Sequence, residues 1–178
     1  MNNEKLTINR HCDWLDNPIH TGIVDPETGK EYILSGYYED ETGNRHFTHQ
    51  QAQLIVARTP GWEPCTDEFH RLLAKTVWDS DTWKWKADVL STGLNGFEYL
   101  TQKLGYELGG YRNREYDSGA LYSVGYGGYS WSSMVAVSRY YAYGLNFTTT
   151  SPDPSYTCYR ANGLQVRCLM KNQPHKSR

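Results

Sequence analysis

The sequence predicts an α+β domain in which two helices pack on short antiparallel strands. Three observations predict this class: a hairpin pattern over residues 22–34, two capped helical segments that begin at Thr48 and Thr66, and a change in composition after Gly105. Helices and strands that occupy separate parts of a chain in this way are typical of α+β proteins.

The hairpin is predicted from two apolar runs on either side of a turn. Residues 22–24 read Gly-Ile-Val, and residues 31–34 read Glu-Tyr-Ile-Leu. Between them, Pro26 and Gly29 suit a tight turn, because proline presets a negative φ and glycine accepts a positive one.

The first helix is predicted from a capping box. Thr48 and Gln51 have the spacing at which each side chain accepts a hydrogen bond from the backbone N–H of the other residue. The helix must end before Pro60, and its apolar face is expected to consist of Leu54, Ile55 and Ala57.

The second helix is predicted to begin after Thr66. Asp67 and Glu68 would lie in its first turn, where the helix dipole favours negative charge. Its buried stripe is expected to consist of Phe69, Leu72, Leu73 and Val77. In the segment after it, large apolar side chains are predicted to anchor core and loops: Trp78, Trp83, Trp85, Leu90, Leu94 and Phe97.

The chain after Gly105 is dominated by Gly, Ser, Tyr and Asn and is predicted to form short antiparallel strands. The apolar pieces expected to form them are residues 121–124, 134–137, 145–147 and 164–170.

The length of 178 residues suits one domain with a short arm. Residues 1–20 are polar and are predicted to be an N-terminal arm. The domain is expected to span residues 21–172, followed by a tail over residues 173–178.

Composition argues against two function classes. The formal net charge of −2 does not suit a general nucleic-acid binder, which needs a basic surface to displace counterions from phosphates. No apolar run of 18 residues occurs, so no membrane insertion is predicted, and the first residues show no secretory signal.

The four cysteines are widely spaced and form no Cys-x-x-Cys pair, so zinc-site spacing is missing. Cys12, Cys65, Cys158 and Cys168 are expected to be isolated thiols, buried or half-buried. One disulfide remains an alternative if the protein matures in an oxidising compartment.

Tyrosine is concentrated in the last third of the chain. Residues 111–160 contain ten of the 15 tyrosines. Between Tyr116 and Arg160 there is no Lys, Glu or Gln, although the chain has 24 residues of these types, and even placement would put about 6 in those 45 positions. Tyr140, Tyr141 and Tyr143 cannot all face one side of a strand, so at least one of them is expected to be exposed.

Two interpretations of this bias are open. A compact β segment can simply prefer Tyr, Ser and Thr to long flexible charged side chains. Alternatively, the segment is a recognition surface, because Tyr offers a large and fairly rigid contact area and Ser, Gly and Asn add adaptable hydrogen bonds.

Metal, calcium and catalytic sites are less well supported. His46 and His49 lie three apart and His70 lies elsewhere, so a metal would lack a third nearby ligand, and these histidines are expected to be exposed. Cys65 and His70 lack an orienting acid, so no catalytic residue is predicted. A calcium lectin would need an Asn after Glu63-Pro64 and more acidic pairs, so neither metal nor cofactor is predicted.

An ordered series of motifs over residues 61–171 resembles the Fibrobacter-type major paralogous domain. The series begins with Gly61-Trp62-Glu63-Pro64-Cys65-Thr66 and Glu68-Phe69, and continues through Ser91-Thr92-Gly93-Leu94-Asn95, Gly110-Tyr111-Arg112, Tyr129-Ser130-Trp131-Ser132-Ser133, Ala142-Tyr143, Leu145-Asn146-Phe147 and Arg160-Ala161-Asn162-Gly163-Leu164-Gln165-Val166-Arg167-Cys168. Within that group, the chain looks most like the variable proteins of diversity-generating retroelements.

This resemblance implies a C-type-lectin-like fold whose final segment is rewritten by error-prone copying at template adenines. An AAC codon changed at its adenines can encode Tyr, Ser, Thr, Asp, Asn, His, Arg or Cys, but never Lys, Glu, Gln, Trp or Met. The missing Lys, Glu and Gln agree with that chemistry, and Trp131 and Met134 would be positions that do not vary.

The resemblance also implies a division between variable surface and fixed support, because only exposed positions tolerate many side chains. The expected variable, ligand-binding residues are Tyr116, Tyr122, Tyr126, Ser138, Tyr140, Tyr141, Tyr143, Ser155, Tyr156, Thr157 and Tyr159. Cys158 is either one more variable position or structural. The expected buried support is Trp131, Leu145, Phe147, Val166 and Cys168.

The function implied is non-enzymatic binding of a protein or glycan receptor on a target cell, by a phage tail or by a bacterial surface after export. The N-terminal arm would dock to the larger virion or surface assembly, and a homotrimer is one open expectation, since phage fibres are commonly trimeric. Two alternatives share the fold: an adhesin or structural module of fixed specificity, and an oxidase resembling the formylglycine-generating enzymes. The oxidase needs a closely spaced cysteine pair, whereas Cys158 and Cys168 are ten residues apart.

Overall fold

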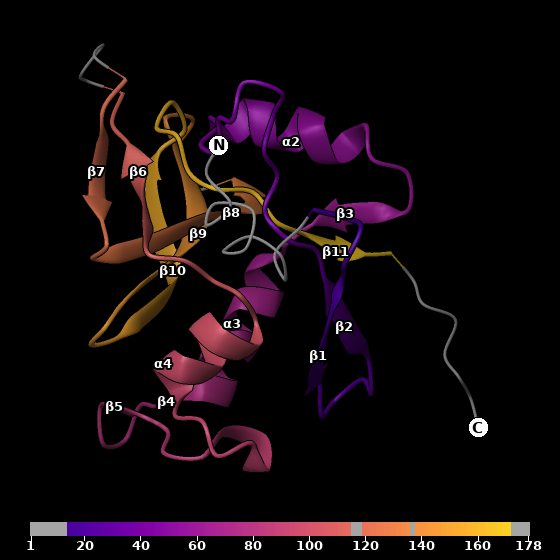
Figure 1. The fold of residues 1–178 in the computed structure, drawn as a ribbon, viewed down its shortest axis with the longest axis vertical. Helices are drawn as coiled ribbons and strands as arrows, with labels where there is room; N and C mark the ends of the chain where they lie inside the picture. Colours follow the sequence, from indigo (N-terminus) through magenta and orange to yellow (C-terminus); the bar gives the residue numbers. More distant parts are fainter. Residues whose placement is uncertain (1–13, 115–118, 136–137, 172–178) are drawn as a thin grey trace, which may run out of the picture.

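The computed structural model describes residues 14–114, 119–135 and 138–171 and shows a mixed α+β architecture (Figure 1). Its strands form small antiparallel sheets around a few helices, so the predicted α+β class is confirmed. Within the described residues, no helix combines the length and the apolar character needed to cross a membrane.

The N-terminal hairpin is confirmed and belongs to a four-stranded sheet. In the turn, Gly29 has a φ of 72° and its N–H donates to the carbonyl of Asp25 at 2.8 Å. The sheet has the order β1-β2-β11-β3, so the last strand of the described chain pairs with the hairpin. Its strands are β1 (Ile19–Val24), β2 (Glu31–Leu34), β3 (Trp62–Pro64) and β11 (Cys168–Met170).

The folded part begins before the predicted domain boundary at residue 21. Strand β1 starts at Ile19, and the Trp14 ring packs edge-on against Tyr38 with 5.2 Å between ring centroids. The carbonyl of Trp14 also accepts a hydrogen bond from the N–H of Gly36 at 2.8 Å.

Helix α2 (His49–Ala57) begins after the predicted capping box at Thr48, which is confirmed. Its buried face differs from the prediction. Leu54 is 46 % exposed and Ala57 is also exposed, whereas His49, Ala52 and Val56 are buried. The rotation of the helix about its own axis decides which side chains are buried. Packing against the core sets this rotation, and a short apolar run does not specify it.

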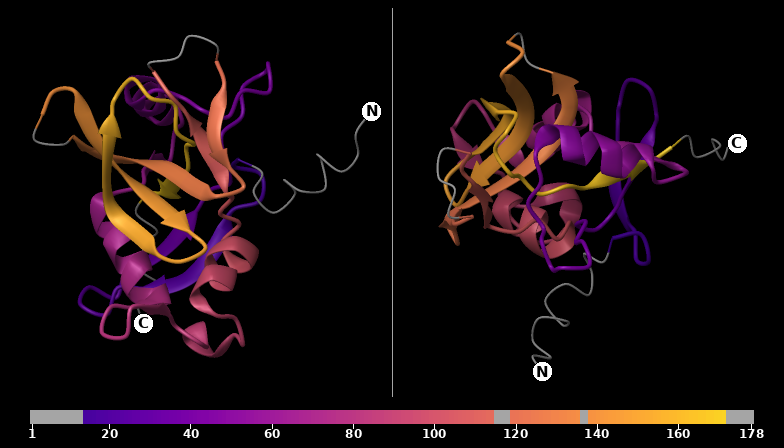
Figure 2. Two further views of the ribbon diagram at one scale, coloured as in Figure 1. Left: turned by 90° about the vertical axis from the view of Figure 1, so that its left-hand side faces the viewer. Right: turned by 90° about the horizontal axis from the view of Figure 1, so that it is seen from above.

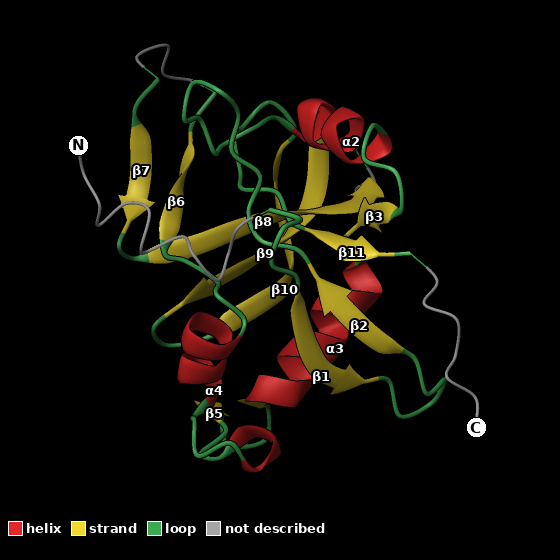
Figure 3. Ribbon diagram, turned by 45° about the vertical axis from the view of Figure 1, so that its right-hand side comes forward, coloured by secondary structure: helices red, strands yellow, loops and turns green. Residues whose placement is uncertain are grey.

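Helix α3 (Asp67–Val77) is capped by Thr66 as predicted, and Phe69, Leu73 and Val77 are buried along it. Figure 3 shows this helix between the β1–β2 hairpin and the sheet that contains β9. Because both sides are covered, its buried face is wider than the apolar stripe and includes His70.

The segment after α3 packs less completely than predicted. Trp83 and Leu90 are 69 % and 56 % exposed, and at both residues the backbone φ is positive. Trp78 is buried, and Trp85, Leu94 and Phe97 pack on the core as partly buried residues. The elements are β4 (Trp78–Asp79), β5 (Lys84–Trp85), η2 (Val89–Ser91), α4 (Gly96–Glu98) and the π-helical turn η3 (Tyr99–Lys103).

The C-terminal half forms a three-stranded sheet and a two-stranded ribbon (Figures 1 and 2). The turn between β9 and β10 reaches the segment after α3, where the indole N–H of Trp85 donates to the carbonyl of Thr149 at 2.8 Å. The sheet has the order β10-β9-β8, and the ribbon pairs β6 with β7. The strands are β6 (Gly109–Arg112), β7 (Leu121–Val124), β8 (Gly127–Val135), β9 (Tyr141–Thr148) and β10 (Pro152–Tyr159).

The strand predictions here are confirmed in part. Residues 121–124 form β7, and residues 145–147 lie in β9. The strand predicted over residues 134–137 instead ends at Val135, with residues 136–137 outside the described part of the chain. Of residues 164–170, only the last three form a strand. Strands β6 and β10 escaped prediction because they contain few aliphatic residues.

The three-stranded sheet carries a core on each face. Side chains alternate along β9, so Ala142 faces one core while Leu145 and Phe147 face the other. The first core contains α3 and the hairpin, and the second contains α2 and Trp131. A sheet held from both sides is a rigid support for the residues at its edge.

Candidate functional site

Four tyrosines, one from each of four strands, form a continuous group of ring contacts. The Tyr111 ring on β6 lies 6.1 Å from that of Tyr122 on β7 and 5.0 Å from that of Tyr129 on β8. The Tyr129 ring in turn lies 5.4 Å from that of Tyr156 on β10. This tyrosine cluster joins the β6–β7 ribbon to the three-stranded sheet.

A second tyrosine pair stands at the end of β9 and β10. Tyr141 and Tyr159 are register partners, and their rings stack with centroids 4.8 Å apart and planes 25° apart. The guanidinium of Arg114 lies 3.8 Å from the centroid of the Tyr159 ring, a favourable cation–π distance.

An open pocket of about 250 Å³ connects the tyrosine cluster with this pair. Its lining comes from the end of β6, from β9 and β10, and from the turn after β10. The lining residues are Tyr111, Asn113, Tyr141, Tyr156, Thr157, Cys158, Tyr159 and Asn162.

Three ionisable groups that line the pocket have raised pKa values. Burial raises the pKa of the Cys158 thiol to about 12. Burial also raises the pKa of Tyr156, and a hydrogen bond with Tyr159 raises that of Tyr141. The lining residues contribute hydroxyl, amide and thiol groups and include no carboxylate and no basic side chain.

Asn162 links the chain after β6 to the end of β10 through hydrogen bonds of its side chain. Its side chain is 5 % exposed, and its Oδ1 accepts a hydrogen bond from the backbone N–H of Arg114 at 3.0 Å. It also hydrogen-bonds the Cys158 thiol. Beside it, Arg112 and Gly163 exchange two backbone hydrogen bonds of 2.8 Å each. These contacts fix β6 against the turn after β10.

Gly110 allows β6 to approach β7 closely before Tyr111. Its φ is 68°, and a Cβ atom at this position would stand 2.3 Å from the carbonyl oxygen of Tyr122. Any other residue would be strained and would clash with backbone, so glycine sets the position of the Tyr111 ring.

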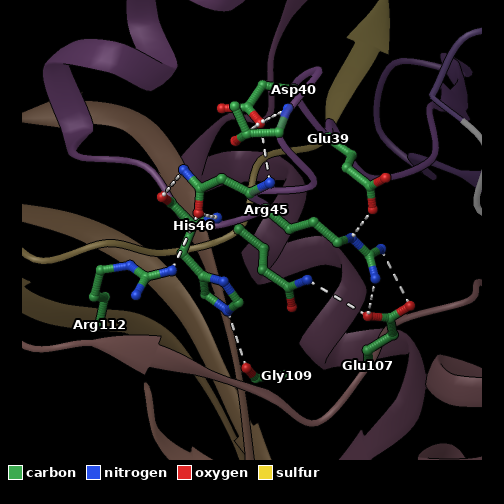
Figure 4. A network of polar contacts seen from close by, with 10 residues as sticks. Glu39, Asp40, Arg45, His46, Glu107, Gly109 and Arg112 are labelled. Atoms are coloured by element: carbon green, nitrogen blue, oxygen red, sulfur yellow. Dashed lines mark hydrogen bonds and ion pairs between the residues drawn. The ribbon is translucent and has the colours of Figure 1, made fainter. Parts of the chain in front are cut away.

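A polar network behind β6 anchors the strand to the loop before α2 (Figure 4). Arg45 makes a two-pronged contact with Glu107, with N–O distances of 3.0 and 3.2 Å. His46 Nε2 donates to the carbonyl of Gly109 at 2.9 Å, and Arg112 donates to the side chain of Asn44 at 3.2 Å. Bidentate Arg–carboxylate pairs fix geometry as well as charge, so this network positions the ribbon.

The structure places the predicted variable residues in three groups. Tyr126 and Tyr140 are 77 % and 57 % exposed, and Ser155 and Thr157 are exposed as well. The exposure of Tyr140 confirms the prediction that at least one of Tyr140, Tyr141 and Tyr143 is exposed. The half-buried ones are Tyr122, Ser138, Tyr141, Tyr143, Tyr156 and Tyr159. Tyr116 lies outside the described residues. The pocket brings together Tyr141, Tyr156, Thr157 and Tyr159.

Four pocket residues were not among the predicted ligand-binding residues: Tyr111, Asn113, Asn162 and Cys158, for which a variable and a structural role were both left open. The signal that could have found Tyr111 is the concentration of tyrosines that begins with it. The sequence does not mark Asn162 as a pocket residue, because its partner Arg114 lies 48 residues away along the chain.

The predicted support residues are buried as expected. Trp131, Leu145, Phe147, Val166 and Cys168 are between 0 and 3 % exposed. Cys158 is also buried, at 7 % exposed, and together with Cys65 and Cys168 is a free thiol.

The prediction of exposed histidines is wrong. His46, His49 and His70 are 9 %, 1 % and 0 % exposed. The Nε2 atom of His46 donates a hydrogen bond to the carbonyl of Gly109 at 2.9 Å, and that of His49 donates one to the carbonyl of Ser132 at 3.0 Å. In the part of the chain that the structure describes, no three His, Cys, Asp or Glu side chains gather in a way that could hold a metal ion.

A comparison of the chain with protein-family models, curated proteins and solved structures found no match.

Proposed function

We propose that this protein is a non-enzymatic binding protein that presents a tyrosine-rich surface to a receptor on a target cell. The observation that carries the proposal is the convergence of tyrosines from β6, β9 and β10 on one open pocket, with Tyr126 and Tyr140 exposed elsewhere in the same tyrosine-rich segment. Tyr side chains at such surfaces commonly dominate binding energy.

We further propose that the scaffold is C-type-lectin-like and that the chain is the variable protein of a diversity-generating retroelement. The order of hairpin, two helices and strands supports the first part, as do the motifs over residues 61–171. The absence of Lys, Glu and Gln between Tyr116 and Arg160 supports the second. The same proposal has three further parts. The receptor lies on a cell to which a phage or a bacterium attaches, the N-terminal arm docks to a larger assembly, and the protein is trimeric.

The separation of exposed and buried residues is consistent with a surface that tolerates change. Thr157 and Ser155 are exposed on β10, while Cys158 between Thr157 and Tyr159 is buried in the core that contains Trp131. Tyr156, also one of the expected variable residues, is partly buried against the same core. Substitution at the exposed positions leaves the core intact, which a diversified protein requires.

The nucleotide sequence around the gene tests this proposal. We expect a near-repeat of the segment that encodes residues 111–168, differing from it only at adenines and lying beside a reverse-transcriptase gene. If that repeat is absent, the retroelement assignment is wrong, and a binding surface of fixed specificity is left.

A further inference from the structure

We infer that the pocket between β6 and β10 binds one neutral sugar ring of a glycan, without calcium. The inference rests on the proposed binding function and names the class of ligand for it. It is carried by the size of the pocket, by the chemistry of its lining and by the rings that border it.

The size of the pocket suits a single ring. Pockets for drug-sized ligands have volumes of roughly 300–1,000 Å³, and this one is smaller, at about 250 Å³, and open to solvent. A terminal sugar of a longer glycan can enter such a pocket while the rest of the glycan remains outside.

The lining suits a ligand that is polar but uncharged. Asn113 contributes an amide, Thr157 a hydroxyl, and the phenols of Tyr111 and Tyr156 can both donate and accept hydrogen bonds. Sugar hydroxyls also donate and accept, so they can replace the water that these groups lose. An apolar protein side chain could not do so, and each buried polar group left without a partner would cost about 1–3 kcal/mol.

Ligand charge is disfavoured for two reasons. The described lining residues include no carboxylate, so no side chain of the pocket would neutralise a cationic ligand or coordinate a calcium ion through a carboxylate. The guanidinium of Arg114, one of the cations beside the pocket, is packed on the Tyr159 ring, where its charge is already in a favourable contact. A neutral ligand leaves that contact unchanged.

The tyrosine rings supply the apolar part of recognition. A sugar ring has one face of C–H groups, which carry slight positive charge, and the face of an aromatic ring is negative. Tyr141 is fixed by stacking on Tyr159, whose other face is covered by Arg114, so little side-chain freedom is lost when a ligand packs against Tyr141.

Two substitutions in the β9–β10 hairpin form a matched test. Thr157 and Thr149 are both exposed, but only Thr157 lines the pocket, and Thr149 lies in the turn between the two strands. Thr157→Arg therefore fills the pocket with a long side chain, while Thr149→Arg adds the same charge at the opposite end of the hairpin from Tyr141 and Tyr159. Neither position is buried, so both variants are expected to fold.

The experiment probes the labelled full chain on an array of neutral, sialylated and sulfated glycans in EDTA, followed by competition with the methyl glycoside of the terminal sugar. We expect at least one neutral glycan to bind. We expect Thr157→Arg to weaken that binding at least about tenfold, which corresponds to about 1.4 kcal/mol, and Thr149→Arg to change it less than about twofold.

Several outcomes overturn the inference: no binding to any neutral glycan, binding that requires calcium or a charged sugar, or equal losses in the two variants. They are distinguishable from failure of the proposed function. If the adenine-specific repeat is found but no neutral glycan binds, the binding function stands and the sugar class is wrong. If a neutral glycan binds without the repeat, the pocket assignment stands in a protein of fixed specificity.

Discussion

Trp131 and Tyr126 stand five residues apart and have opposite environments. Trp131 is 3 % exposed, and its indole N–H donates to the carbonyl of Phe47 at 2.6 Å. Tyr126 is 77 % exposed. We expect Trp131→Ala to lower the free energy of unfolding by about 3–5 kcal/mol, because it leaves a cavity and removes one of the two hydrogen bonds that the Phe47 carbonyl accepts. Tyr126→Ala should change it by less than about 0.5 kcal/mol.

Urea denaturation followed by circular dichroism measures both changes. A loss above about 1.5 kcal/mol in Tyr126→Ala would show that this ring packs against the protein, and the residue could then not be part of a freely variable surface.

His70 gives the folded state a defined dependence on pH. It is fully buried on α3, neither ring nitrogen has a hydrogen-bond partner among the described residues, and burial lowers its pKa from 6.5 to about 3. Below pH 6.5 the unfolded chain takes up a proton that the folded protein does not. The free energy of unfolding should therefore fall as the pH drops from 6.5 towards 3, by up to about 1.4 kcal/mol per pH unit, and His70 should add no slope above 6.5.

Urea titrations between pH 4.5 and 7.5 test this effect with His70→Leu as the variant. The slope below pH 6.5 should decrease and not vanish, since burial also lowers the pKa of His46 and His49. Because His70 makes no hydrogen bond that leucine would break among the described residues, stability at pH 7.5 should be little changed. An unchanged slope would mean that His70 is protonated in the folded protein.

At the scale of elements, the capping box of α2 makes a measurable contribution to the free energy of unfolding. The Thr48 side chain accepts a hydrogen bond from the N–H of Gln51 at 3.2 Å, and the Gln51 side chain accepts one from the N–H of Thr48 at 2.9 Å. We expect Thr48→Ala to lower the free energy of unfolding by about 1 kcal/mol. Gln50→Ala is the control, because Gln50 is exposed in the same turn and takes no part in the box.

The same urea titration compares the two variants. Equal effects of Thr48→Ala and Gln50→Ala would show that tertiary contacts, and not the cap, hold the start of α2. Those contacts exist: His49 on this turn donates to the carbonyl of Ser132, and its ring packs edge-on against Trp131 at 5.1 Å.

At the scale of the whole molecule, the buried thiols report whether the two cores are closed. Burial raises the pKa of Cys65, Cys158 and Cys168, so little thiolate forms at pH 8. In a Cys12→Ser variant, we expect no fast reaction with Ellman's reagent in the folded state and three reactive thiols in guanidinium chloride. Fast labelling of Cys158 in the folded state would show that the reagent reaches this buried thiol through the pocket. Fewer than three reactive thiols after unfolding would indicate a disulfide.

What the sequence by itself determined is local. The hairpin turn at Gly29, the caps at Thr48 and Thr66, and the concentration of tyrosine after residue 110 depend on residues within a few positions of one another, so their signals can be read from the chain. The same signals predicted the α+β class, because they separate helical from strand-forming segments.

Tertiary structure alone decided which side chains are covered and which meet. Asn162 reaches Arg114 across 48 residues, and His49 reaches Ser132 across 83. The rotation of α2 buried His49 and exposed Leu54, against the prediction from apolarity. The pocket formed where the β6–β7 ribbon met the edge of the three-stranded sheet. The physical reason is that burial depends on the summed packing of distant segments, to which local patterns of turns, caps and apolar residues contribute no specific information.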